Sequence, residues 1–445
     1  MKREEEIFKL YNEIDELIDS VSFDDKKQKI NNDYGSNIPE MTKVVFDNNN
    51  ITKYKEKTKE EKELIKNIKK EETIKLSEEI KNELDGLETK KQEKINSKEK
   101  SKVKKERKKN KKNKIKKWVI TFGVLDLIAI ICLFLMYGPI SYFRNLWVTS
   151  AMSTMTHQYL AYIFFNQQQI DKIMSNNVVI EVDEDTNKEE IDFKQEEIVE
   201  YSSIYEEQVL KKEEGNDLYK VIEIEGDNYK GHLLVVYDAS KIQLAEIANY
   251  KYGQTIEQFV KKNNAVAGIN AGGFVYSEYK GYTPTGTVII DGKVKFNNGG
   301  TGWGGGIVGF TNDNVLVLTK ASANQALQMG IRDAVSFGPF LVVNGVASQF
   351  KGNGGYGIAP RTAIGQRKDG IVLLLVIDGR RPGHSLGVDM VELTNIMLRY
   401  GAYNASNLDG GGSSSIVVEG KTLSVAGGSG YSGERYLPNS WLVIP

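Results

Sequence analysis

The longest apolar stretch of the chain runs from Trp118 to Ile140. It has about the 20 residues that a helix needs to cross a bilayer. It begins more than a hundred residues into the chain, so we expect a membrane span and not a signal peptide. Eleven basic residues and one acid, Glu106, lie between Lys102 and Lys117, and nothing comparable follows the span. The positive-inside rule therefore predicts a single-pass protein of the cell membrane with a cytoplasmic N-terminus and an extracytoplasmic C-terminal domain.

A second apolar run, Ile371–Ile377, has the length of a strand and no alternation, which indicates a strand buried on both faces. After it, apolar residues recur at helical spacing between Val388 and Tyr400, and Gly401 supplies a natural C-terminal stop. Asn407–Asp409 then begins another ordered segment. This order predicts a β-α-β unit.

Two carboxylates stand at matching places in that unit, Asp378 after the first strand and Asp409 at the end of the second. In a β-α-β unit the two strands run parallel, so both residues would emerge at the same sheet edge, where α/β sheets bind ligands. We therefore expect Asp378 and Asp409 to be close neighbours.

The remaining pattern divides the chain into five regions. They are a charged, largely disordered or helical cytoplasmic region (1–117), the transmembrane helix (118–140), juxtamembrane amphipathic helices (141–180), an acidic linker (181–216) and an extracytoplasmic domain (217–445). Short β-rich runs between Gly-rich turns predict an α/β, mixed α+β, fold for the last region.

Composition changes this picture in two places. The net charge of −1 is an average over the whole chain and does not show the basic tract. This tract could bind nucleic acid, but it is explained more simply as a topology signal that also binds anionic lipid. We therefore expect the membrane as partner and no nucleic acid. The single cysteine, Cys132, lies in the span, so we expect the outer domain to be stabilised without disulfides.

Three motifs of the C-terminal region carry candidate chemistry. In Asn407–Ser415, Asp409 precedes three glycines and three serines, a composition typical of an anion site beside an acid. In Ala267–Phe274, a short strand delivers Asn270 into a glycine turn. In Ile358–Gly365, Arg361 stands where a guanidinium could clamp a phosphate. Taken singly, these are also the signatures of a tight turn or a surface ion pair.

Together with Asp378-Gly-Arg380, these motifs resemble the phosphodiester glycosidase family, in motif order over about residues 218–445. The resemblance implies hydrolysis of the bond between the anomeric carbon of a sugar and a phosphodiester oxygen, as in N-acetylglucosamine-1-phosphodiesters. Membrane-anchored bacterial relatives are often labelled exopolysaccharide biosynthesis proteins, so the expected partner is a sugar phosphodiester or an anionic envelope glycopolymer.

Glycoside cleavage requires two carboxyl groups about the scissile bond. We expect Asp409 and Asp378 to serve as nucleophile or base and as electrostatic stabiliser, in either order, with Glu392 as a third acid. The residues expected to bind substrate are Arg361, Arg380, His384, Asn270, Gly272, Gly273, Gly410, Gly411, Gly412, Ser413 and Ser414.

Several alternatives stay open. Adjacent strands, about 4.8 Å apart, would suit a retaining mechanism, and one intervening strand, about 10 Å, an inverting one. We expect no cofactor, although Ca²⁺ or Mg²⁺ held by Asp378 and Asp409 remains compatible with the sequence. A noncatalytic module that binds anionic glycopolymer and a metal-dependent phosphodiesterase that cuts the P–O bond are the competing functions.

Overall fold

The computed structural model describes residues 116–154, 157–193, 200–299, 304–424 and 434–445, with scattered positions between 102 and 114. Most of the predicted cytoplasmic region 1–117 lies outside these residues. Within them, one helix, Lys116–Tyr137, is long and apolar enough to cross a membrane by length and composition. Its side chains are almost all exposed, so it is not the core helix of a soluble domain.

Three short helices follow this apolar helix: α3 (Ser141–Met152), α4 (Tyr159–Tyr162) and α5 (Gln167–Ser175). They share a small core of their own with the end of the apolar helix, made of Met136, Val148, Ala151, Ala161, Phe165 and Ile170. Strand β1 (Val178–Ile180) then pairs antiparallel with β15 (Gln349–Lys351). The helices are therefore tied to the C-terminal domain by backbone pairing.

The stretch expected to be an acidic linker, 181–216, lies against the domain wherever it is described. It contains the short helices η1 (Lys188–Glu190) and α6 (Ile204–Leu210). Glu181 accepts from the Phe340 N–H at 2.7 Å, and the carbonyl of buried Val209 accepts from the Tyr237 hydroxyl at 3.0 Å. A few buried residues thus dock a segment whose acidic composition suggested a spacer.

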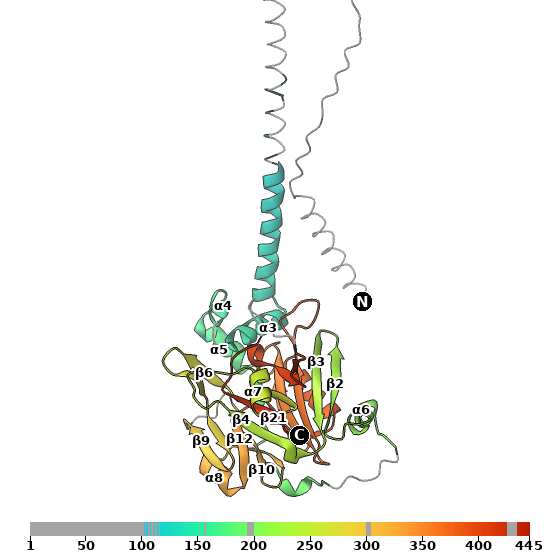
Figure 1. The fold of residues 1–445 in the computed structure, drawn as a ribbon. Helices are drawn as coiled ribbons and strands as arrows, with labels where there is room; N and C mark the ends of the chain where they lie inside the picture. The colour runs from blue at the N-terminus through green and yellow to red at the C-terminus, as the bar shows by residue number, and fades with distance from the viewer. Residues whose placement is uncertain are drawn as a thin grey trace, which may run out of the picture. The chain divides into compact units, whose positions relative to one another are not determined.

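The largest sheet has seven strands. In spatial order they are β14 (Val346–Ala347), β13 (Phe340–Val343), β18 (Ala402–Asn407), β16 (Arg361–Arg367), β17 (Val372–Ile377), β3 (Tyr229–Val236) and β2 (Tyr219–Gly226). Of these, β3 and β2 are labelled side by side in Figure 1. Helix α9 (Met390–Arg399) packs its buried residues into the cluster that covers one face of this sheet. Asp389 caps α9, its carboxylate accepting from the Glu392 N–H at 2.9 Å.

Two five-stranded sheets and a hairpin complete the domain, with β4 beside β21 and α8 near β12 (Figure 1). One sheet is β20 (Lys421–Thr422), β19 (Ile416–Val418), β5 (Ala267–Asn270), β21 (Asn439–Val443) and β4 (Ile242–Glu246). The other is β11 (Leu316–Thr319), β10 (Gly306–Thr311), β12 (Ile331–Phe337), β8 (Thr287–Ile290) and β9 (Lys293–Asn297). The hairpin and the remaining helices are β6 (Phe274–Ser277), β7 (Gly281–Pro284), η2 (Ala239–Lys241), α7 (Ile256–Lys262), α8 (Ala323–Gln328) and η3 (Gly411–Ser413).

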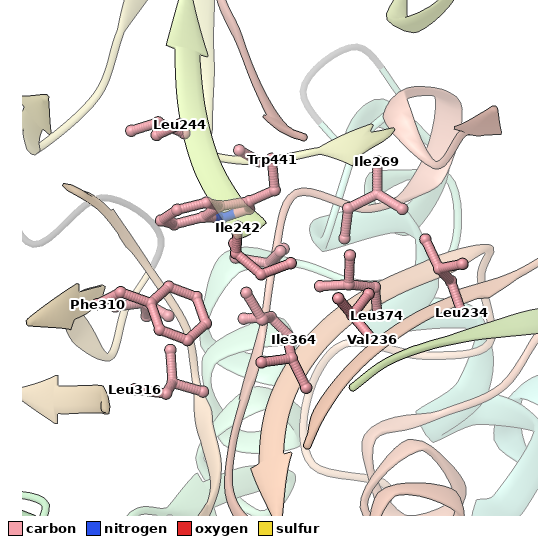
Figure 2. Close-up of a cluster of buried hydrophobic side chains, with 14 of the residues drawn as sticks. Leu234, Val236, Ile242, Leu244, Ile269, Phe310, Leu316, Ile364, Leu374 and Trp441 are labelled. Atoms are coloured by element: carbon pink, nitrogen blue, oxygen red, sulfur yellow. The ribbon is translucent and has the colours of Figure 1, made fainter. Parts of the chain in front are cut away.

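The main core lies where the three sheets meet (Figure 2). Leu234 and Leu374 of the large sheet face the cluster that contains Ile269 and Trp441 of a second sheet and Phe310 of the third. Alternate residues of the same strands, such as Leu373, belong to the cluster on the opposite face with α9. All of β17 is buried, as its unbroken apolar run predicts.

The two strands of the predicted β-α-β unit run in the predicted direction, and of the two spacings left open by the sequence the one with an intervening strand is found. Both β17 and β18 pair antiparallel with β16, so they run parallel to each other and end at the same edge. However, β16 lies between them, because it forms a tight hairpin with β17 and the crossover through α9 passes over it. Every strand pairing among the described residues is antiparallel, so the fold is α+β and not a parallel α/β sheet.

Candidate active site

A cavity of about 1100 Å³ lies at the sheet edge where β18 ends. One part of its wall is polar and contains Asp409, the three glycines that follow it, and the side chains of Arg361, Arg380 and Arg435. Another part comes from the end of the apolar helix and from α3, and it contains apolar side chains such as Leu135 and Trp147 together with the polar Ser150. The cavity therefore joins the sequence motifs to the segment that precedes the domain.

Asp409 is the candidate catalytic carboxylate that the structure places in this cavity. Its backbone N–H donates to the Ala271 carbonyl at 3.1 Å, which fixes the turn after β18. Burial raises the pKa of its carboxyl to about 6, while the Ser413 hydroxyl, the Arg435 charge and the Gly410 N–H oppose that rise. A carboxylate with such a pKa can exchange a proton near neutral pH.

The glycines after Asp409 have different roles. The Gly410 N–H donates to the Asp409 carboxylate and the Gly411 N–H donates to the Pro360 carbonyl at 2.9 Å. Gly411 has a φ of +63° and lies under Arg380, whose terminal nitrogens would be 3.5 Å from an added Cβ. Among the described groups none accepts the Gly412 N–H, and a Cβ there would meet nothing within 4 Å. One backbone donor of the predicted nest is thus available to a ligand.

Arg361 is buried and holds its surroundings together. Its Nε donates to the Val388 carbonyl at 3.1 Å, and its Nη2 donates to the carbonyls of Tyr356 and Gly357 at 2.9 and 2.7 Å. Burial, helped by the Arg380 charge, lowers its pKa to about 10. Its Nη1 makes no hydrogen bond to the described residues and remains for an anion in the cavity.

Arg380 is the more accessible cation. It stands in the loop after β17 with a φ of +58°, and its guanidinium makes no hydrogen bond to the described residues. Partial burial lowers its pKa. A charged side chain at a cavity wall that makes no hydrogen bond to the described residues is suited to receive an anion.

Arg435 was not singled out by the sequence analysis. It comes shortly before β21, donates from Nη1 to the Ser413 hydroxyl at 3.2 Å and lies over the Phe274 ring at 4.7 Å. Its charge also acts on Asp409. It follows a Gly- and Ser-rich sequence without a recognisable motif, so only its contacts reveal it.

Asp378 does not line the cavity. It is buried at the end of β17, where its Oδ2 lies 2.7 Å from His384 Nε2 and its carbonyl accepts from the Ser385 hydroxyl at 2.6 Å. Its charge also acts on His232 of β3, whose pKa burial lowers. Two strand spacings, about 10 Å, separate the ends of β17 and β18, which is the arrangement that suits an inverting pair, but neither Asp378 nor His384 lines the cavity.

Glu392 is also outside the cavity. Its Oε1 accepts from the Tyr229 hydroxyl at 2.7 Å and lies 3.3 Å from Arg399 Nη2. These contacts link α9 to β3, and the role of Glu392 as a third acid stays a prediction.

Asn270 supports Asp409 from behind. Its Oδ1 accepts from the Thr362 hydroxyl and the Ser415 N–H at 2.8 and 3.1 Å, and its Nδ2 donates to the Asp409 carbonyl at 2.6 Å. These three hydrogen bonds use both acceptor positions of the Asn270 amide and one of its two N–H donors, so the side chain positions the turn that carries Asp409.

Of the other predicted binding residues, some make hydrogen bonds within the protein and one makes none to the described residues. The Gly272 N–H donates to the Asn439 side chain at 2.8 Å, and the Gly273 carbonyl accepts from Thr285. Ser413 accepts from Arg435, whereas the buried Ser414 hydroxyl makes no hydrogen bond to the described residues. Within the part of the chain that the structure describes, no group of three His, Cys, Asp or Glu side chains could hold a metal ion.

Comparison with known proteins points to one family. Residues 263–444 match the family model described as phosphodiester glycosidase, so the resemblance found in the sequence is confirmed. The chain is 30% identical over 177 residues to the SPbeta prophage-derived uncharacterized protein YomE of Bacillus subtilis (strain 168), covering 38% of this chain and 27% of that protein.

An animal enzyme matches over a shorter stretch. The chain is 33% identical over 84 residues to N-acetylglucosamine-1-phosphodiester alpha-N-acetylglucosaminidase of Bos taurus, covering 19% of this chain and 14% of that protein. Among solved structures, the catalytic domain of the zebrafish enzyme auto-inhibited by its pro-peptide aligns with a TM-score of 0.44 and 21% identity, over 52% of this chain and 85% of that one. The chain thus spans about a quarter of the prophage protein and about a seventh of the bovine enzyme.

Proposed function

We propose that this chain, whose residues 263–444 carry a phosphodiester glycosidase domain, hydrolyses sugar-1-phosphodiesters resembling N-acetylglucosamine-1-phosphodiester. It acts outside the cell membrane, held by the helix Lys116–Tyr137, on phosphodiesters of envelope or exopolysaccharide polymers. The observation that carries the proposal is one carboxylate, Asp409, with a pKa of about 6, in a cavity that it shares with the guanidinium groups of Arg380 and Arg435.

The substrate is bound through its charge. The phosphodiester anion lies against Arg380 and Arg435, with the Gly412 N–H and the Arg361 Nη1 as further donors. These groups stabilise the negative charge that grows on the phosphate as the anomeric C–O bond breaks. Because a phosphate is a good leaving group, the reaction needs little help from a general acid.

Asp409 acts at the anomeric carbon. In its ionised form it either attacks that carbon or takes a proton from the attacking water. Asp378 stays paired with His384 beside the site and contributes through the field it creates. Because Asp378 is paired with His384 and does not line the cavity, we favour water as the nucleophile and Asp409 as the base. NMR should then show the inverted anomer as the first product; the retained anomer would indicate attack by Asp409 itself.

The test uses the full chain in detergent with the methyl phosphodiester of N-acetylglucosamine in water enriched in ¹⁸O. We expect free sugar and methyl phosphate without ¹⁸O, since the C–O bond breaks. Methyl phosphate containing ¹⁸O, or sugar phosphate, would show attack at phosphorus and contradict the proposal. The same assay after EDTA treatment measures any dependence on Ca²⁺ or Mg²⁺.

Asp409→Asn is the matched control, because it keeps the size of the side chain and removes the base. We expect turnover to fall by at least 10³-fold, in line with the loss of a catalytic base. If the parent protein bound sugar phosphodiesters without turnover, and Asp409→Asn bound them equally well, the competing binding-module function would be favoured.

A further inference from the structure

The cavity that contains Asp409 is lined by large apolar side chains as well as by arginines. The apolar ones include Leu135 and Met136, from the last turn of the apolar helix, and Phe143, Leu146 and Trp147 from α3. We call these five residues the apolar wall. The proposed glycosidase chemistry does not need it, because sugars and phosphates are polar.

The apolar wall is firmly attached to the catalytic domain. The Asn353 side chain donates to the Thr149 hydroxyl at 2.9 Å, and Gly357 lies so close to α3 that an added Cβ would be 2.2 Å from the Ser150 Oγ. The Gly357 carbonyl in turn accepts from Arg361. The wall and the anion-binding side of the cavity are therefore parts of one structure.

The wall is also continuous with the candidate membrane span. Two of its residues belong to the helix Lys116–Tyr137 itself, and Phe143 is 43% exposed beside the exposed residues Ile140 and Tyr142. An apolar surface that starts in a membrane span and ends at a phosphate-binding site suits a ligand with one apolar and one anionic end.

We propose that the substrate is a lipid-linked sugar phosphodiester, with its lipid chain on the apolar wall and its phosphodiester against Arg380 and Arg435. This inference rests on the proposed function. It identifies the second substituent of the phosphodiester, opposite the sugar, as a lipid. A water-soluble phosphodiester would leave the wall exposed, whereas a long hydrocarbon chain removes apolar surface from water along its length.

The reaction then yields two products. Water gives its oxygen to the anomeric carbon, and the electron pair of the broken C–O bond stays on the phosphate oxygen. The proton that water releases passes through Asp409 to solvent. The products are the free reducing sugar and a lipid phosphate monoester, which remains in the membrane.

The experiment compares two diesters of N-acetylglucosamine 1-phosphate, one methyl and one carrying a 16-carbon alkyl chain, with the full chain in detergent. We expect kcat/KM to be at least tenfold higher for the long-chain diester. Equal values would overturn the lipid inference and leave the proposed function intact.

The long-chain diester also partitions into detergent micelles, which could raise its kcat/KM without any contact with the apolar wall. Variants of the wall distinguish these two effects. Phe143→Ser removes a partly exposed wall residue, and we expect the long-chain to methyl ratio of kcat/KM to fall at least threefold. Ile163→Ser, at an exposed apolar residue of the same segment outside the cavity, is the control and should keep the ratio. A ratio unchanged in Phe143→Ser would refute the role of the wall.

Binding to the Asp409→Asn protein gives a readout without turnover. We expect the long-chain diester to bind at least tenfold more tightly than the methyl diester. If neither diester were hydrolysed by the parent but this preference remained, the proposed function would fail and the lipid site would stand. No preference in binding would remove the lipid site whatever the activity.

Discussion

At the scale of single residues, Asp409 is a half-buried carboxylate in the cavity wall, and the proposed function gives it the role of catalytic base. The fold raises the pKa of this carboxyl to about 6 because burial disfavours its charged form. At neutral pH the Asp409 carboxylate is ionised, which lowers the free energy of unfolding of the protein. Perturbed pKa values of this kind are common at functional sites. Two measurable consequences follow, one for stability and one for the pH profile.

Asp409→Asn should stabilise the protein at neutral pH while abolishing turnover. Because the folded pKa lies above the unfolded value, the folded protein binds the proton more tightly, and its stability falls as pH rises from about 4 to about 6. Removing the charge should therefore raise the free energy of unfolding by about 2 kcal/mol at pH 7.5 and by nothing below pH 4. Thermal unfolding at both pH values measures this, and a loss of stability at pH 7.5 would contradict it.

Arg435→Gln should shift the acidic limb of the pH profile of kcat/KM. The Arg435 charge lowers the pKa of Asp409, so its removal should move the limb from about 6 to higher pH, and activity at pH 7 should fall more than at pH 8.5. Arg399→Gln is the control, since Arg399 pairs with Glu392 outside the cavity. If the acidic limb of the kcat/KM profile had the same midpoint in Arg435→Gln and in the parent, the Arg435 charge would not act on the proposed base Asp409.

At the scale of elements, the site depends on three strands that meet behind Asp409. Asn270 ends β5, Thr362 is the second residue of β16, and Ser415 precedes β19. The Asn270 amide hydrogen-bonds to Thr362, to Ser415 and to the Asp409 carbonyl. The helices contribute from further away, with α9 covering the opposite face of the large sheet. The strands therefore place the catalytic turn, and the helices stabilise the sheet that carries it.

Asn270→Ala should destabilise the domain and slow turnover together. It leaves the Ser415 N–H, the Thr362 hydroxyl and the Asp409 carbonyl without a partner in a buried place, at a cost of about 2–4 kcal/mol. The midpoint of thermal unfolding should drop by several degrees and kcat should fall. Asn395→Ala, on the exposed side of α9, should change neither, and a similar drop in both variants would argue against the network.

At the scale of the whole molecule, the helices after the apolar segment form part of the catalytic cavity. Their attachment relies on Gly357, which has a φ of +58° and leaves no space for a side chain beside Ser150. The described residues of the acidic stretch likewise pack on the domain, which leaves little of the chain between the apolar helix and the sheets as a free spacer. If the helix Lys116–Tyr137 anchors the protein as proposed, the cavity lies close to the membrane.

Gly357→Ala should detach α3 from the domain. The added Cβ would collide with Ser150, so we expect faster limited proteolysis between residues 141 and 175 and a lower kcat/KM. Gly420→Ala is a matched control: Gly420 also has a positive φ, +71°, but nothing lies within 4 Å of its Cβ position. If both variants were cleaved at the same rate, backbone strain alone would explain the effect.

The sequence by itself determined the features that local pattern records. The unbroken run of β17, the helical spacing of α9 with its glycine stop, and the long apolar helix each follow from burial, which repeats along the chain. The motifs around Asn270, Arg361 and Asp409 were also recognisable, because backbone turns beside a ligand need glycine and a small set of polar residues. These signals sufficed for the family.

Only the tertiary structure decided which of these residues meet. The insertion of β16 between β17 and β18, the turning of Asp378 toward His384, and the arrival of Arg435 beside Ser413 all depend on long-range pairing. Hydrogen-bond partners and side-chain directions across a sheet are set by contacts between distant segments, and no local periodicity encodes them. For the same reason, the placement of α3 against the catalytic cavity could not be read from the order of residues.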